Sequence, residues 1–230
     1  MLKLKGLNII AGHYGSGKTN IAVNFAIAAK KSSPDKIVRL ADLDIVNPYF
    51  RTADSKELLE ESGVEVLIPE FANTNVDIPA IPPRMTSLFE NHGDSADISV
   101  IDVGGDEGAV ALGMYNIPIK SMDYDMFYIV NMYRPLVSTP EAAAECLRDI
   151  EASCGLRATK LINNSSLGRE TTAQDIADSV EYAEKCAELC GIELYCHTYV
   201  LEYAPDAPAY VSEKAKKILF PIDDIPKKLF

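Results

Sequence analysis

The chain has 230 residues, of which 47% are hydrophobic and 24% are charged, a composition typical of a soluble globular domain. Its formal net charge of -12 disfavours binding to nucleic-acid phosphates, since no run of Lys and Arg offsets the acidic excess. No apolar run approaches the ~20 residues of a membrane span, and the N-terminus lacks a signal-peptide pattern. We therefore expect a cytoplasmic protein that contacts neither membrane nor nucleic acid.

Short apolar runs alternate with helical patterns along the first half of the chain. We predict strands at residues 7–11, 36–44, 64–70 and 98–105, and a helix at residues 17–31. The polar stretch at residues 45–62 is expected to end in a short helix. The Pro-rich residues 71–85 predict a long surface loop.

The same alternation continues in the second half. We predict strands at residues 126–131, 158–164 and 192–201, and helices at residues 138–153, 172–191 and 212–220. Ser138 or Thr139 is expected to cap the first of these helices, Gly191 to end the second, and Pro221 to end the third. Strands separated by helices predict a single α/β domain over residues 1–230, with a mostly parallel sheet between two helical layers.

The first predicted loop has the spacing G-x-x-x-x-G-K-[ST] between a strand and a helix. In such a loop the backbone N–H groups surround the phosphates, the lysine reaches the β- and γ-phosphates, and the Thr hydroxyl binds Mg²⁺. Lys18 is thus also a catalytic candidate. We assign this loop and the next residue to a nucleotide site: Gly12, His13, Tyr14, Gly15, Ser16, Gly17, Lys18, Thr19 and Asn20.

Acidic residues follow two other predicted strands. Asp102 ends the strand at residues 98–105, where its carboxylate could hold Mg²⁺ through water, and the N–H of Gly105 could sense a γ-phosphate. Asp42 and Asp44 flank Leu43, so extended geometry places both carboxylates on one side. We expect Asp42 and Asp44 to belong to the Mg²⁺ site, and Asp44 also to orient the attacking water as a catalytic residue, together with Lys18 and Asp102.

The nucleotide base is predicted from the strand at residues 158–164. GTPases of this architecture carry Asn-Lys-x-Asp after a late strand, and the Asp reads guanine. This chain has LINNSSLG there, with no acid at the final position. The amide of Asn164 could instead contact the edge of adenine, which favours ATP over GTP.

The three loops together resemble the ParA/MinD-type (CobQ/CobB/MinD/ParA) branch of the SIMIBI class of P-loop ATPases, which includes the nitrogenase iron protein. The resemblance covers most of the chain and implies a three-layer α/β/α fold with seven or eight mostly parallel strands. It also implies a nucleotide-dependent homodimer that binds two ATP molecules, with Mg²⁺, across its interface. The segment YAPDA resembles the adenine-side loop of that branch, which implicates Pro205 and Asp206.

The chain departs from this pattern at the second loop position. Most of the branch has a lysine there that reaches the partner's phosphates, whereas this chain has His13, whose imidazole lacks a permanent charge. Arg51 or Arg84 could supply the charge instead, or His13 and Tyr14 could simply line the loop. The segment after Asp102 also lacks the cysteine that a bridging iron–sulfur cluster needs.

Two of the five cysteines, Cys186 and Cys190, have a spacing compatible with one helix face. They could hold a metal, but reduced thiols packed in the core are the simpler interpretation.

Three functions are compatible with these motifs. The first is a slowly hydrolysing ATP-dependent switch that acts on a client protein, for example in metallocofactor insertion or enzyme activation. The second is an ATP-dependent ligase or kinase acting on a small carboxylate, as in relatives that resemble dethiobiotin synthetase, with residues 71–85 and Arg84 as the acceptor site. The third, a DNA-positioning protein, is disfavoured by the charge of -12.

Overall fold

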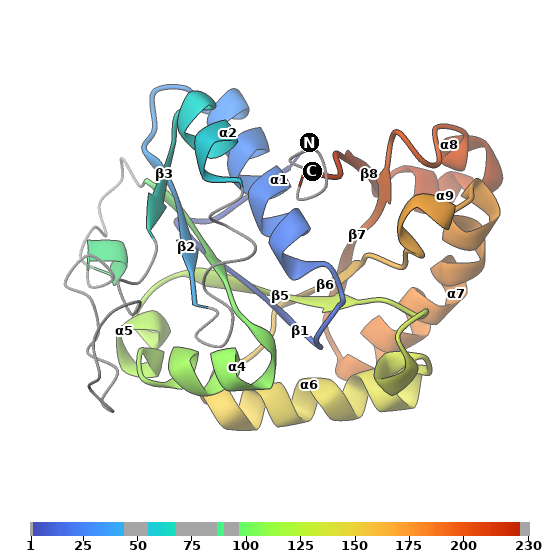
Figure 1. Cartoon of the computed structure of the whole chain (residues 1–230). Helices are drawn as coiled ribbons and strands as arrows, with labels where there is room; N and C mark the ends of the chain where they lie inside the picture. The colour runs from blue at the N-terminus through green and yellow to red at the C-terminus, as the bar shows by residue number, and fades with distance from the viewer. Residues whose placement is uncertain (1, 44–54, 68–86, 90–96, 226–230) are drawn as a thin grey trace.

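The fold is built on an eight-stranded sheet in the order β3-β2-β4-β1-β5-β6-β7-β8 (Figure 1). The computed structural model describes residues 2–43, 55–67, 87–89 and 97–225, and the structural statements below refer to these residues. Every pair of neighbouring strands is parallel. The strands are β1 Leu7–Gly12, β2 Val38–Asp42, β3 Val64–Leu67, β4 Ile98–Asp102, β5 Tyr124–Val130, β6 Lys160–Asn163, β7 Glu193–Val200 and β8 Leu219–Ile222.

Helices connect these strands and cover both faces of the sheet (Figure 1). The longer ones are α1 Lys18–Ser32, α4 Gly105–Gly113, α6 Pro140–Cys154 and α7 Ala173–Cys190. The shorter α-helices are α2 Lys56–Glu61, α5 Asn116–Lys120, α8 Ala207–Tyr210 and α9 Glu213–Lys216, with 3-10 turns η1 Ser87–Phe89, η2 Pro135–Val137 and η3 Gly168–Glu170.

Two hydrophobic cores fill the spaces between the three layers. Alternating strand residues face opposite sides: Ile9 and Tyr128 pack in the core beneath α4, α6 and α7, whereas Ile10 and Phe127 pack beneath α1. Strands buried on both faces explain the continuous apolar runs in the sequence. The predicted three-layer α/β/α architecture with a mainly parallel sheet is thereby confirmed.

The helix ends follow the predicted capping chemistry. Thr139 caps α6 by accepting from the Ala142 N–H, and Gly191 ends α7 in the left-handed conformation. Thr172 and Asp175 form a capping box at the start of α7, because each side chain accepts from the backbone N–H of the other.

The predicted C-terminal helix at residues 212–220 is wrong beyond its first turn. Helix α9 ends at Lys216, and the apolar residues that follow form β8, which includes Pro221. The carbonyls of Ile218 and Ile222 accept from the N–H groups of His197 in β7 and of Leu201 directly after it. Pro221 lies between them, where its nitrogen faces the free edge, so a strand at the end of the sheet tolerates it.

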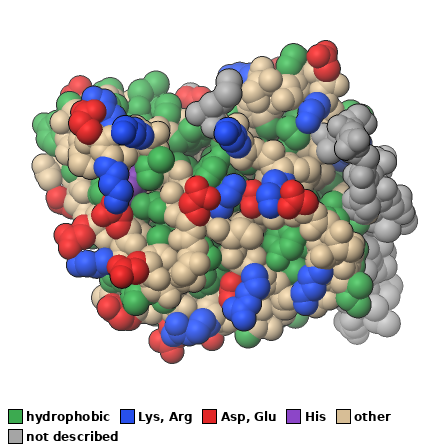
Figure 2. Space-filling model, turned by 180° about the vertical axis from the view of Figure 1, so that it is seen from behind, with side chains coloured by type: hydrophobic (Ala, Val, Ile, Leu, Met, Phe, Trp, Pro, Cys, Tyr) green, Lys and Arg blue, Asp and Glu red, His purple; other side chains and the backbone are tan. Residues whose placement is uncertain are grey.

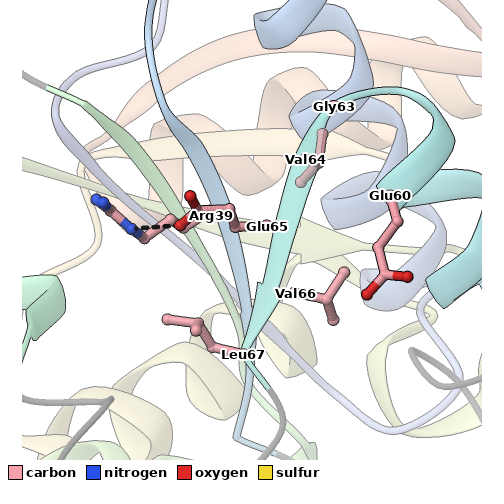
Figure 3. A pocket seen from close by; sticks show the side chains of 7 residues that line it. All are labelled: Arg39, Glu60, Gly63, Val64, Glu65, Val66 and Leu67. Atoms are coloured by element: carbon pink, nitrogen blue, oxygen red, sulfur yellow. Dashed lines mark hydrogen bonds and ion pairs between the residues drawn. The ribbon is translucent and has the colours of Figure 1, made fainter.

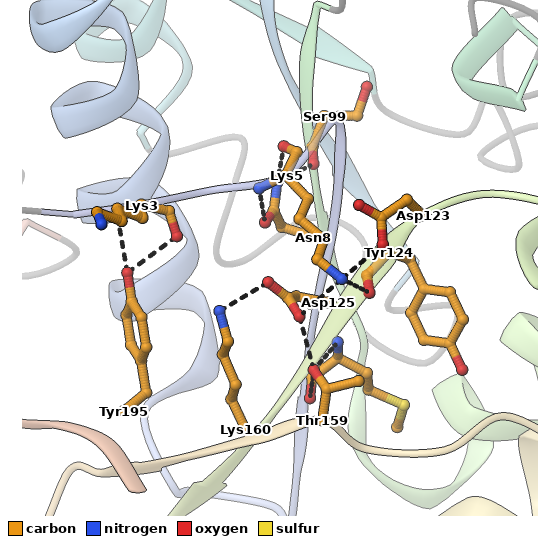
Figure 4. A network of polar contacts seen from close by, with 11 residues as sticks. Lys3, Lys5, Asn8, Ser99, Asp123, Tyr124, Asp125, Thr159, Lys160 and Tyr195 are labelled. Carbon is orange, nitrogen blue, oxygen red and sulfur yellow. Dashed lines mark hydrogen bonds and ion pairs between the residues drawn. The ribbon is translucent and has the colours of Figure 1, made fainter. Parts of the chain in front are cut away.

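A polar network closes the edge of the sheet at the amino-terminal ends of the strands (Figure 4). Asp125, 2% exposed, accepts from Lys160 at 2.8 Å and from the Thr159 hydroxyl at 2.9 Å, and Lys5 lies 3.4 Å from it. A hydrogen bond from Lys5 to Asp123 raises the Lys5 pKa. Ion pairs therefore occupy this edge of the sheet, and the loop between β1 and α1 lies at the opposite edge.

The surface carries interspersed charges on the face shown in Figure 2, where Lys and Arg side chains lie among Asp and Glu. Within the described ranges, the helices are too short or too polar to cross a lipid bilayer.

Candidate nucleotide-binding site

The loop between β1 and α1 lies at the carboxyl edge of the sheet. Gly12 is required by close packing, since a Cβ at this position would lie 2.5 Å from the Ile129 carbonyl oxygen of β5. Gly17 precedes α1 with φ +88°, a left-handed conformation that favours glycine, and a Cβ there would lie 2.2 Å from Asn164 Nδ2. The backbone shape and close packing of this loop therefore explain why the sequence has glycine at positions 12 and 17.

The carbonyl groups of the loop are held by hydrogen bonds. The His13 carbonyl accepts from the Ser16 N–H at 3.2 Å and from Lys18 Nζ at 3.1 Å. The Ser16 carbonyl accepts from Asn164 Nδ2 at 2.7 Å, and the Gly15 carbonyl accepts from Arg134 Nε at 2.8 Å. Fixing carbonyls in this way restrains the backbone and prepares a nest of N–H groups for an anion.

The first turn of α1 buries two of the predicted site residues, Lys18 at 4% exposure and Thr19 at 8%. Their side chains begin where the positive end of the helix dipole lies. An ammonium group and a hydroxyl at the helix N-terminus suit a polyphosphate and its metal ion.

Two predicted carboxylates come together on neighbouring strands. Asp42 ends β2 and Asp102 ends β4, and the two residues are directly paired in the parallel register. Both are buried, at 1% and 3% exposure. Leu40 and Val100, two residues earlier, pack beneath α1, so both carboxylates face the side on which α1 lies. Carboxylate and hydroxyl oxygens are the ligands that Mg²⁺ prefers, so Asp42, Asp102 and Thr19 fit a magnesium site.

Asn164 makes a different contact from the one expected. Its Nδ2 donates to Ser16, and its Oδ1 accepts from the Thr198 hydroxyl at 2.7 Å. The side chain, 8% exposed, therefore holds the phosphate loop against β7. Its contact with the adenine edge stays a prediction.

The other predicted residues are found in the phosphate loop, at the start of α4 and in the turn after β7. His13 is half-buried, and Tyr14 is 61% exposed. Gly105 begins α4, directly after Asp102 and the two residues that follow it, so it remains near the carboxyl edge. Pro205 and Asp206 are exposed in the turn after β7 that leads into α8.

The side chain of Asn20, another residue of the predicted nucleotide site, contacts Asn24 and Ile225, and its contact with the nucleotide stays a prediction. Its Oδ1 accepts from Asn24 Nδ2 at 3.1 Å and from the Ile225 N–H at 3.2 Å. The second of these bonds holds Ile225 against α1.

Several predictions fall outside the described residues. Asp44, Arg51, Arg84 and the loop at residues 71–85 belong to this group. Three predicted roles therefore stay predictions: Asp44 as the carboxylate that orients water, Arg51 or Arg84 as the alternative positive charge, and residues 71–85 as the acceptor loop of the ligase hypothesis.

Two contributors to the site were missed by sequence reasoning. Arg134 follows β5 and contacts Gly15, and Thr198 lies within β7 and supports Asn164. Neither belongs to a local motif. The order of the strands brings them to the loop, and that order could not be read from the residues alone.

The cysteines are packed as thiols. Burial raises the pKa of Cys186 to about 12 and that of Cys190 to about 11, so both stay protonated near neutral pH. Among the described residues, groups of three or more His, Cys, Asp or Glu side chains suited to a metal are absent. The packing therefore favours the structural interpretation of these cysteines.

A hollow of about 660 Å³ lies away from the loop, along the edge strand β3 (Figure 3). Arg39 and Glu65 both line it and pair with each other at 3.1 Å, and Arg39 also pairs with Asp97 at 2.9 Å. Because these charges satisfy one another, the hollow offers less to an anion than the loop does.

Comparisons with known proteins bear on the fold. The chain matches FtsY from Mycoplasma mycoides with a TM-score of 0.51 at 16% sequence identity, over 97% of this chain and 64% of that one. It matches the signal recognition particle receptor FtsY from Elizabethkingia anophelis with a TM-score of 0.48 at 17% identity, over 98% of this chain and 64% of that one. This chain thus spans less than two thirds of each structure. The first likeness supports a P-loop α/β fold.

Sequence comparison identifies no family. A glutamate–tRNA ligase from Legionella pneumophila is 25% identical over 163 residues, which cover 70% of this chain and 32% of that protein. No family model matches the chain. Fold and loop together define a domain of the P-loop α/β type. Loops of this spacing bind nucleotide phosphates together with Mg²⁺ in other proteins.

Proposed function

We propose that the protein is an ATP-binding, slowly ATP-hydrolysing molecular switch of the ParA/MinD type that acts on a protein partner. The observation that carries this proposal is the convergence at one sheet edge of the phosphate loop with Lys18 and the in-register pair Asp42 and Asp102. A loop alone could bind many anions, whereas the loop with two buried carboxylates suits a magnesium–nucleotide complex.

Each residue has a defined task in this proposal. The loop amides and Lys18 bind the phosphates, and Thr19, Asp42 and Asp102 hold Mg²⁺, which neutralises charge on the phosphates. Asp44 orients the attacking water. The first turn of α4 at Gly105 and the segment at residues 44–52 respond to the γ-phosphate, as switch loops do.

Adenine is the proposed base. The loop after β6, residues 164–167, reads Asn-Ser-Ser-Leu and has no acid that could read guanine. Leu167, 47% exposed, occupies the final position. Discrimination for guanine requires an acceptor for its N–H groups, and an apolar side chain offers none.

The resemblance to ParA/MinD-type proteins supports a nucleotide-dependent homodimer and a client protein. A client in metallocofactor insertion or enzyme activation fits a switch with slow turnover. The net charge of -12 supports a protein client over nucleic acid.

Binding of a fluorescent ATP analogue, competed with ATP and with GTP, tests the proposal. We expect Mg²⁺-dependent binding, preference for ATP, slow phosphate release, and loss of binding in Lys18→Ala. The matched control is Lys31→Ala, an exposed lysine at the other end of α1. Unchanged binding and turnover in Lys18→Ala would remove the basis of the proposal.

A further inference from the structure

The connection from β5 to α6 brings an arginine to the phosphate loop. Arg134 Nε donates to the Gly15 carbonyl at 2.8 Å. A Cβ on Gly15 would lie 3.2 Å from Nε and 3.3 Å from Cζ of Arg134. The guanidinium group therefore lies directly against Gly15.

The backbone that carries Arg134 is fixed by its neighbours. Asn131, 2% exposed, donates from Nδ2 to the Ser166 carbonyl and accepts at Oδ1 from the N–H groups of Ser166 and Tyr133. The Arg134 N–H in turn donates to the Asn131 carbonyl at 3.0 Å. The backbone of Arg134 is thus already fixed by hydrogen bonds after the end of β5. Less backbone entropy is therefore lost when the side chain contacts a bound nucleotide.

The charge of Arg134 is available to an anion. The ion pairs found among the described residues do not include Arg134. Its side chain is exposed, and its bond to Gly15 is to a neutral carbonyl. A guanidinium keeps its charge at any physiological pH. Arg134 therefore places a permanent positive charge beside the phosphate loop, in which the second position is His13.

We propose that Arg134 is a positioning residue of the nucleotide site. It holds the Gly15 carbonyl by a hydrogen bond and adds a charge that favours the more highly charged nucleotide. The proposal rests on the proposed function, because it requires that the loop bind a polyphosphate. Because Arg134 contacts Gly15 of its own chain, we expect it to act on the nucleotide site of the same subunit.

Three substitutions separate the two contributions. Arg134→Ala removes the contact and the charge, Arg134→Gln keeps an N–H donor without charge, and Arg134→Lys keeps the charge without the planar fork. The matched control is Arg157→Ala, since the Arg157 side chain is 83% exposed and pairs with Glu151 away from the loop.

Equilibrium titration with fluorescent ATP and ADP analogues, together with thermal melts, measures the effect. We expect Arg134→Ala to raise the Kd for ATP about tenfold, the scale of one charge-assisted hydrogen bond, and to raise the Kd for ADP less. Arg134→Lys should restore the preference for ATP over ADP, and Arg134→Gln should restore only part of the affinity. Arg157→Ala should bind as wild type.

Each alternative result is decisive. If wild type binds ATP, Lys18→Ala does not, and Arg134→Ala binds within twofold of wild type, the proposal for Arg134 fails while the proposed function stands. Loss of the same size in Arg157→Ala, or an effect seen only at protein concentrations where the chain dimerises, would also overturn it. If wild type binds no nucleotide, both proposals fail. Should Arg134→Ala unfold, the Lys and Gln variants carry the same comparison.

Discussion

Replacing Gly17 with alanine tests the phosphate loop at its tightest point. At φ +88° an L-residue costs about 1 kcal/mol, and the new Cβ would lie 2.2 Å from Asn164 Nδ2. Asn164 must then move and give up its 2.7 Å bond to the buried Ser16 carbonyl, which costs a further ~1–3 kcal/mol. We expect Gly17→Ala to lower the free energy of unfolding by about 2–4 kcal/mol.

Gly191→Ala is the matched control. Gly191 has φ +67° and no atom within 4 Å of its Cβ position, so alanine there costs only the backbone term of about 1 kcal/mol. Urea unfolding of both variants, and of Gly17→Ala combined with Asn164→Ala, gives a double-mutant cycle. Without the Asn164 side chain, Gly17→Ala should cost about as much as Gly191→Ala.

Nucleotide titration completes this test. Gly17→Ala should lose at least about tenfold in affinity for ATP, since the displaced loop no longer presents its amides. Equal destabilisation in Gly17→Ala and Gly191→Ala, or a cost at Gly17 that persists without the Asn164 side chain, would refute the assigned clash.

Two further predictions concern buried titratable side chains. Burial lowers the pKa of His197 to about 4 from its ordinary 6.5, so the folded state disfavours protonation and loses stability as the pH falls from 6.5 towards 4. The loss reaches at most about 3 kcal/mol, and unfolding curves of His197→Gln should lack it; parallel pH profiles would contradict this. Asp125→Asn should lower the free energy of unfolding by about 1.5–3 kcal/mol, because Lys160 keeps its charge without the carboxylate that accepts its hydrogen bond. The control is Asp123→Asn, whose side chain is 84% exposed and whose loss should cost under ~1 kcal/mol. Equal losses in the two variants would contradict the inference that burial makes the Asp125 pair the more important one.

The features that the sequence predicted are those set by neighbouring residues. The strand-loop-helix signature at residues 7–31 places a glycine-lined turn before α1, because backbone conformation and capping act over a few residues. The caps at Thr139 and Gly191 follow from the same local chemistry. Asp42 and Asp102 could be placed at strand ends for this reason as well.

Tertiary structure decided which of these ends meet. The pairing of β2 with β4 sets Asp42 beside Asp102, and the positions of β5 and β6 bring Arg134 and Asn164 to a loop 119 and 148 residues away in the sequence. The last strand, β8, formed where a helix was predicted, because the edge of β7 offered backbone partners to its apolar residues. Sequence by itself determined the local shape of the phosphate loop, whereas its supports depend on strand order, which arises from burial and pairing across the whole sheet.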